Sequence, residues 1–199
     1  MSDDRAARLA EVGKKLDGLI ESPLYEHRLR NDYHPVLGEG SPHARILFIG
    51  EAPGKQEAKT GRPFVGASGR VLAELLASID LDREDVYITN VVKDRPPDNR
   101  DPQAAEIELY RPLLAEQIDI IRPAVIATLG RFAMEFVFEH FGMKEVGGKI
   151  SQLHGTVLTA HAPYGEVAVM PLYHPAVALY NQSQRGTLEE DFQALAQFA

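Results

Sequence analysis

Short apolar runs alternate along the chain with longer stretches in which apolar residues return at helical spacing. The runs are rich in β-branched residues and bounded by turn residues, so each predicts a buried strand. The expected strands are 46–49, 86–89, 125–129 and 166–170. The expected helices are 4–21, 71–79, 104–121, 130–140 and 188–198. This alternation predicts an α/β fold, a three-layer α/β/α sandwich with a central, mostly parallel four-stranded sheet.

Two segments give weaker signals. Residues 22–43 are rich in Pro, Gly and His and predict an irregular connection, and residues 147–161 predict a hairpin or a pair of edge strands. No repeat, low-complexity tract or linker interrupts the pattern. A chain of 199 residues with 44% hydrophobic residues can form one core, so we expect a single domain over 1–199.

Residues 50–69, GEAPGKQEAKTGRPFVGASG, directly follow the first predicted strand. Their glycines let the backbone bend and their prolines stiffen it, so we expect a shaped loop that is neither strand nor helix. The loop carries Glu51, Lys55 and Lys59, and its Phe64 is expected to be exposed. A loop at the carboxyl end of a parallel strand is the usual place for a ligand.

Two other interpretations of this loop are a phosphate-binding P-loop and an ordinary strand-to-helix connection. The spacing of Gly50 and Gly54 is too short for a phosphate-binding P-loop, and Gln56 follows Lys55 where a magnesium-binding hydroxyl would be needed. An ordinary strand-to-helix connection stays open as the simpler alternative, although long loops in compact domains are usually functional.

Composition excludes several classes of protein. The net charge of −8 argues against nonspecific coating of nucleic acid, although a local basic face remains open. Its candidate residues are Lys55, Lys59, Arg62, Arg70, Lys93, Arg95 and Arg100. With 0 cysteines the chain has no disulfide, zinc thiolate or thiol nucleophile, and its 7 histidines lack metal-ligand spacing. Without a signal peptide or a long apolar span, we expect a soluble, cytoplasmic protein.

Three polar residues follow the ends of predicted strands: Glu51, Asn90 and His174. Because parallel strands end at the same edge of a sheet, we expect them to share one crevice. An acid, an amide and an imidazole can activate water, bind a hydrogen-bonding edge and stabilise a developing anion. Each also has a structural interpretation: a surface carboxylate, a turn cap and a turn residue before Pro175. Phe64 can equally be a core residue.

The motifs at these positions resemble those of the family 4 uracil-DNA glycosylases, within the wider uracil-DNA glycosylase superfamily. The resemblance runs in order from about residue 22 to 190 and rests on several motifs. They are residues 50–69, 86–93 (VYITNVVK), 95–100 (RPPDNR) and 174–176 (HPA).

The resemblance implies roles for the residues of the crevice. Glu51 would orient or activate the water that attacks the sugar C1′, and His174 would hydrogen-bond uracil O2 as the base leaves. Other residues would bind the flipped base by lining its pocket, stacking on it or reading its edge. They are Gly50, Ala52, Phe64 and Asn90.

Contacts to DNA are expected outside the pocket. Basic residues would grip phosphates, and Leu179 or Tyr180 would wedge into the base stack, where family members often carry a leucine pair and this chain has Ala178-Leu179. The DNA-binding candidates are Lys55, Arg95, Arg100, Leu179 and Arg185.

The chain departs from the family at the iron–sulfur cluster, which members typically hold with cysteines. The matching positions here are Leu19, Ser22, Asp94 and Tyr110. None is a thiolate, so we expect no metal or cofactor, with packing around Tyr110 in its place.

The sequence therefore predicts a monomeric, monofunctional glycosylase that removes uracil from DNA and leaves an abasic site. No lysine at a motif position suggests a lyase step, and residues 90–102 lack the histidine-bearing insertion of members that bond covalently to DNA. Two alternatives are a module that binds uracil or deaminated DNA without excising it, and an unrelated nucleotide-binding α/β protein.

Overall fold

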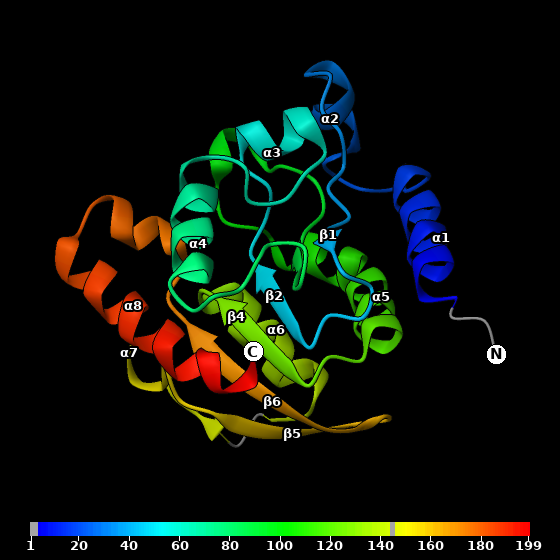
Figure 1. The fold of residues 1–199 in the computed structure, drawn as a ribbon. Helices are drawn as coiled ribbons and strands as arrows, with labels where there is room; N and C mark the ends of the chain where they lie inside the picture. The colour runs from blue at the N-terminus through cyan, green and yellow to red at the C-terminus, as the bar shows by residue number, and fades with distance from the viewer. Residues whose placement is uncertain (1–3, 144–145) are drawn as a thin grey trace.

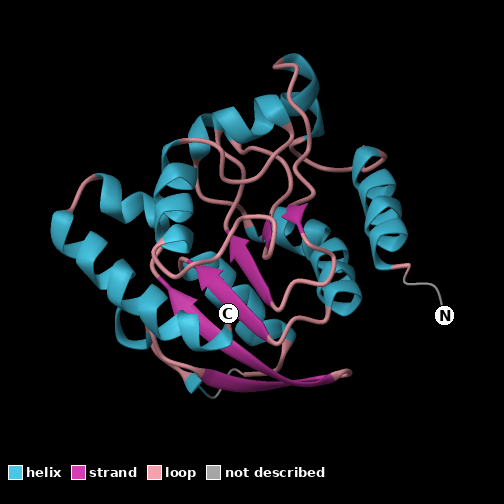
Figure 2. Ribbon diagram, viewed as in Figure 1, coloured by secondary structure: helices cyan, strands magenta, loops and turns pink. Residues whose placement is uncertain are grey.

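The computed structural model describes residues 4–143 and 146–199. A central sheet lies between two layers of helices, as Figures 1 and 2 show, so the predicted three-layer α/β/α architecture is confirmed. In chain order the elements are α1 Arg5–Asp17, α2 Tyr25–Arg30, β1 Glu39–Gly40, β2 Ile46–Gly50, α3 Lys55–Thr60, α4 Ala67–Ala77, β3 Tyr87–Asn90, η1 Pro97–Asn99, α5 Ala104–Ile121, β4 Val125–Leu129, α6 Arg131–His140, α7 Ile150–Leu153, β5 Leu158–Ala162, β6 Gly165–Leu172, η3 Pro175–Leu179, α8 Gln182–Leu195 and η4 Ala196–Phe198.

The sheet has six strands in the order β1-β3-β2-β4-β6-β5, so the prediction of four was wrong. The predicted strands are the parallel ones, β2, β3, β4 and β6. The two additional strands are antiparallel and lie at the edges. β1 has only two residues, and β5 buries only Ala160 along its length, so neither carries a strong apolar pattern.

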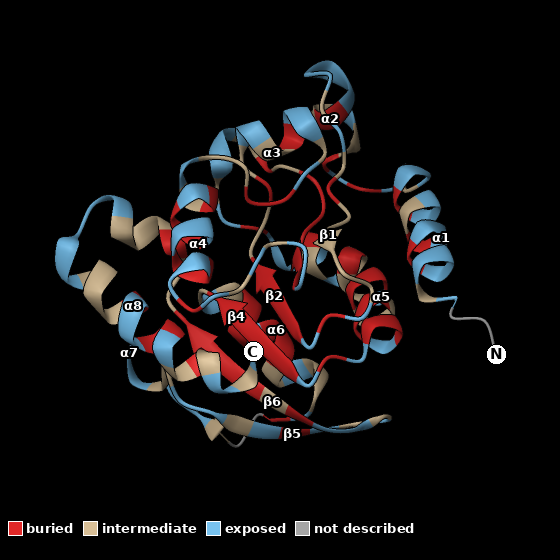
Figure 3. Ribbon diagram, in the orientation of Figure 1, coloured by how far each residue is buried: buried red, intermediate tan, exposed pale blue. Residues whose placement is uncertain are grey.

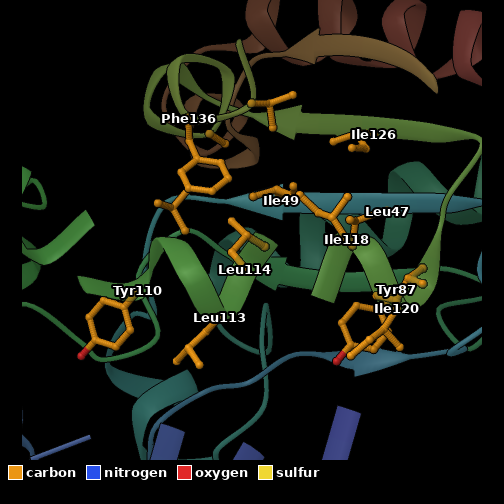
Figure 4. Close-up of a cluster of buried hydrophobic side chains, with 14 of the residues drawn as sticks. Leu47, Ile49, Tyr87, Tyr110, Leu113, Leu114, Ile118, Ile120, Ile126 and Phe136 are labelled. Carbon is orange, nitrogen blue, oxygen red and sulfur yellow. The ribbon is translucent and has the colours of Figure 1, made fainter. Parts of the chain in front are cut away.

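The sheet buries both of its faces. Alternate residues of β2 enter different cores: Leu47 and Ile49 pack with α1, α5 and α6, whereas Ile46 and Phe48 pack with α4 and α8. Figure 3 shows the buried strands, and Figure 4 shows the core between the sheet and α5. Such two-sided burial explains why the central strands have continuous apolar sequences.

The expectation of an irregular stretch over residues 50–69 was wrong, because it contains α3 and the start of α4. Its glycines mark the ends of these helices. Gly54 and Gly66 are the N-caps of α3 and α4, and Gly61 ends α3 with φ of 70°. That left-handed conformation suits glycine.

Other boundaries also differ from the prediction. Residues 22–43 contain α2 and β1, and residues 147–161 contain α7 and most of β5, which pairs with β6 as a hairpin. α1 ends at Asp17, and α8 begins at Gln182 rather than 188 because the Asn181 side chain caps it by accepting a hydrogen bond from Ser183 N. No helix within the described residues combines the length and apolar character needed to cross a membrane.

Candidate active site

The carboxyl ends of the parallel strands place the predicted polar residues. Gly50, the last residue of β2, pairs in register with Asn90, the last residue of β3. Glu51 follows Gly50 directly, and His174 lies just beyond Leu172, the last residue of β6. The backbone of β2 continues past its end, since Gly50 O and Glu51 O accept hydrogen bonds from Val91 N and Val92 N at 2.9 and 3.0 Å.

A pocket of about 80 Å³ opens beside these strand ends. Its lining residues are Ala52, Gly54, Glu57, Phe64, Ser68, Asn90 and His174. The structure thus brings together Ala52, Phe64, Asn90 and His174, which the sequence assigned to base binding and catalysis. Glu51 is half-buried near the same strand ends and does not belong to this lining.

Asn90 presents an unused hydrogen-bond acceptor. The residue is 2% exposed, and its Oδ1 is buried without a partner among the described residues. A Cβ on Gly50 would lie 2.4 Å from this oxygen and 2.7 Å from the Phe64 ring. Only glycine therefore leaves room for the strand end, the amide and the aromatic ring to approach one another.

Phe64 is 6% exposed, so the expectation that it is exposed was wrong. Its ring lies 5.7 Å from the His174 ring, centroid to centroid. Its φ of 49° is unusual for a residue with a side chain, and two neighbours hold this backbone. Arg83 donates to Phe64 O and Pro63 O, and Glu57 Oε1 accepts from Val65 N at 2.9 Å.

His174 is neutral at physiological pH. Burial lowers its pKa to about 4, with the nearby Glu57 carboxylate acting in the opposite direction. Its Nδ1 accepts a hydrogen bond from Ala176 N at 3.2 Å. The proton of the neutral ring therefore lies on Nε2, which makes this nitrogen a donor.

The pKa of the Glu51 carboxyl is raised, as suits a general base. Burial, followed by the negative charge of Asp101, raises its pKa, and Arg131 opposes this shift. A carboxylate whose pKa is raised binds a proton more readily than one in water, which suits a group that activates a water molecule.

Sequence reasoning missed three residues of this region. Glu57 and Ser68 line the pocket, and Arg83 holds the backbone of Phe64. Glu57 joins α3 to the beginning of α4 by accepting hydrogen bonds from Val65 N and Gly66 N. No local motif marks these roles, because they depend on how α3 and α4 lie against each other.

None of the five DNA-binding candidates lines the pocket. Lys55 and Leu179 are exposed, with Leu179 at the end of η3, close after His174. Arg95 donates to Tyr33 and Asn99 side chains. The remaining two form ion pairs, Arg100 with the buried Glu106 and Arg185 with Glu74 and Glu189. Their roles toward DNA stay predictions.

Lys93 does not belong to a basic surface, contrary to one expectation from the sequence. Its side chain is 0% exposed and is held inside the protein by hydrogen bonds. The basic face expected from residues 55–100 therefore lacks one of its members.

A buried polar network occupies the positions that match the family's cluster ligands. Tyr110 Oη donates to Asp94 Oδ2 at 2.6 Å and lies 2.6 Å from Ser22 Oγ, while Arg28 pairs with Asp94 at 3.3 Å. The fourth position, Leu19, offers only hydrocarbon. These groups satisfy one another and include no thiolate, so they do not fit an iron–sulfur cluster. No metal-binding group of histidine, cysteine or acidic residues occurs within the described residues.

The chain is similar in sequence to a known family and to several known proteins. Residues 37–197 match the family described as the uracil DNA glycosylase superfamily. Proteins named type-4 uracil-DNA glycosylase are similar to most of the chain. That of Sulfurisphaera tokodaii is 48% identical over 82% of this chain and 74% of its own length, and that of Archaeoglobus fulgidus is 46% identical over 86% and 84%. That of Thermotoga maritima is 42% identical over 94% and 92%. The chain belongs to the uracil DNA glycosylase superfamily.

Proposed function

We propose that this protein hydrolyses the N-glycosidic bond of uracil in DNA and leaves an abasic site, the first step of base excision repair. The family membership and the type-4 relatives support this activity. We further propose that residues 1–199 act as a single, monomeric domain in the cytoplasm and do not cleave the DNA strand.

The unpartnered Oδ1 of Asn90 is the observation that carries the proposal. A buried acceptor without a partner is costly, and a ligand N–H would satisfy it. Uracil offers such an N–H at N3, beside a carbonyl at O4 that can accept from the Asn90 amide. A base in duplex DNA must leave the stack to reach this pocket, and Phe64 offers the flipped base an aromatic face.

The chemistry follows from the two ends of the breaking bond. Cleavage leaves an oxocarbenium-like sugar and negative charge on the base. The neutral His174 donates from Nε2 to uracil O2 where that charge grows, which is worth about 10²–10³ in rate for comparable donors. Glu51 stabilises the cationic sugar and orients the attacking water. Ala52 and Gly50 shape the pocket.

DNA contacts outside the pocket complete the proposal. Lys55 and Arg95 would contact phosphates, and Leu179 would fill the space that the flipped base leaves. Arg100 and Arg185 would have to exchange their present acidic partners for phosphates, so we expect them to contribute less.

We also propose that the enzyme works without a metal or cofactor, since the network around Tyr110 replaces thiolates with mutually satisfied polar groups. The purified protein is expected to show no absorption near 400 nm and no stoichiometric iron, and to keep its activity in chelator. Iron bound in proportion to protein would overturn this expectation.

The decisive experiment uses end-labelled oligonucleotides that contain one uracil opposite guanine, opposite adenine or unpaired. After incubation, alkali converts abasic sites into strand breaks. Wild-type protein is expected to give alkali-dependent cleavage, and Glu51→Gln and His174→Ala are each expected to lose about 10²–10⁴ in rate.

Lys15→Gln serves as the control because Lys15 pairs with Glu116 on the surface, within the α1–α5 region. It is expected to behave as wild type. Uracil-selective binding without cleavage would instead indicate a recognition module, and cleavage without alkali would indicate a lyase.

A further inference from the structure

Lys93 is a buried cation at the end of the strand that carries Asn90. Its Nζ donates to Gln117 Oε1 at 2.5 Å, Thr89 Oγ1 at 2.6 Å and Asn90 O at 2.8 Å, while Leu37 O is more distant at 3.4 Å. The Lys93 side chain is 0% exposed. Nothing in the proposed chemistry has yet used this group.

The neighbours of Lys93 Nζ are all acceptors. The Thr89 hydroxyl donates its own proton to Leu37 O at 2.6 Å, and the Gln117 amide nitrogen donates to Leu37 O at 3.0 Å. Three close acceptors match the three donors of an ammonium, whereas a neutral amine has only two and would turn a lone pair toward an oxygen. The site is therefore built for the charged form.

Among the described residues, no carboxylate is a hydrogen-bond partner of Lys93 Nζ. The adjacent Asp94 is held by Arg28 and Tyr110 instead. Burial lowers the pKa of Lys93 well below its ordinary value. The three close hydrogen bonds that Nζ donates are those of the charged form. Removing a cation from water without a counter-ion lowers the free energy of unfolding. Proteins tolerate such a loss of stability mainly at functional sites.

The charge lies behind the pocket. Neighbouring strand residues point to opposite faces, and Tyr87 and Thr89 face α5 while Ile88 belongs to the core that includes Phe64. Lys93 thus holds the α5 side of the strand end, and the Asn90 side chain lines the pocket on the other side. A single strand of protein separates the ammonium from a base bound to Asn90.

We propose that Lys93 is a positioning residue for Asn90. The buried ammonium of Lys93 also stabilises the negative charge that develops on the departing uracil. The inference rests on the proposed glycosylase function. His174 supplies a hydrogen bond but no charge, since its neutral ring donates from Nε2. A fixed cation in a medium of low dielectric adds an electrostatic attraction to the anionic base, which a neutral donor cannot provide.

The test compares two variants on two leaving groups. Lys93→Met removes the charge at similar length, and Gln117→Met removes one partner of the ammonium but keeps the charge. Rates are measured with saturating enzyme in single turnovers on oligonucleotides that contain uracil or 5-fluorouracil, whose anion is more stable in itself. Thermal unfolding establishes that each variant is folded.

Lys93→Met is expected to slow uracil excision by about 10- to 100-fold and 5-fluorouracil excision by clearly less. Gln117→Met is expected to slow both bases by the same small factor. Equal losses on both bases in Lys93→Met, or no loss, would overturn the inference. If wild-type protein excises neither base, the proposed function itself fails.

The absence of cysteine allows a second test that does not depend on the methionine variant. Lys93→Cys can be alkylated in denaturant with bromoethylamine, which rebuilds an ammonium of lysine length, or with iodoacetamide, which adds a neutral group. Wild-type protein carried through the same steps reports on refolding. If only the ammonium group restores the rate of uracil excision, the role of the charge is supported. If both groups restore the rate equally, or if neither does while the wild-type control refolds fully, the role of the charge is excluded.

Discussion

At the scale of single residues, the protonation state of His174 links the proposed chemistry to stability. Burial lowers its pKa to about 4, whereas an imidazole in the unfolded chain titrates near pH 6.5. As the pH falls below 6.5, the unfolded chain takes up a proton at this ring and the folded protein does not until about pH 4. The free energy of unfolding therefore decreases across this window.

We expect this residue to contribute about 1–3 kcal/mol to the pH dependence between pH 7 and 4. Urea unfolding of wild-type protein and His174→Asn at pH 7 and pH 4.5 measures it, because all other titrating groups cancel in the comparison. Wild-type protein is expected to lose more stability than the variant on acidification. An identical loss in both would show that the ring is not held neutral.

At the scale of secondary-structure elements, Glu57 connects two helices to the aromatic wall of the pocket. Its carboxylate oxygen accepts from Val65 N and Gly66 N at 2.9 and 2.7 Å, at the beginning of α4. A negative charge there is favourable for the helix and fixes the loop that carries Phe64.

Glu57→Ala is expected to lower the free energy of unfolding by about 1–2 kcal/mol and to raise KM for uracil-containing DNA as Phe64 loses its fixed position. Chemical unfolding and steady-state kinetics measure the two effects. Glu11→Ala, whose carboxylate pairs with Lys14 on the exposed side of α1, is expected to change stability by less than about 0.5 kcal/mol. A KM unchanged in Glu57→Ala would contradict the role in placing Phe64.

The central strands could be predicted from the sequence, whereas one edge strand and some residues of the site could not. The parallel strands were found because β2 and β4 bury every residue and leave an unbroken apolar run. The edge strand β1 was missed because it has only two residues. β5 was expected only as part of a hairpin or a pair of edge strands over residues 147–161, because it buries little along its length. Asn90 and His174 followed from the rule that parallel strands end together. Glu57 and Lys93 did not, since their roles depend on where a side chain turns after the chain has folded.

At the scale of the whole molecule, the network of Ser22, Arg28, Asp94 and Tyr110 joins segments far apart in sequence. Ser22 lies between α1 and α2, Arg28 on α2, Asp94 after β3 and Tyr110 on α5. Arg28 also reaches Asp17 O at the end of α1. The network therefore fixes the N-terminal helices against the loop that continues to Arg95.

Tyr110→Phe is expected to lower the free energy of unfolding by about 2–4 kcal/mol, because Ser22 Oγ and Asp94 Oδ2 each lose a buried partner. The melting temperature would fall by about 4–16 °C. Tyr87→Phe is the matched control, since Tyr87 packs in the same core (Figure 4). Among the described residues its hydroxyl accepts one hydrogen bond, a longer one of 3.3 Å from Gln117 Nε2. The control variant is expected to lose less than about 1 kcal/mol. Because the network lies outside the pocket, folded Tyr110→Phe is expected to excise uracil at low temperature within about threefold of the wild-type rate. A large loss of rate without a loss of stability would mean that the network acts on the chemistry rather than on the fold.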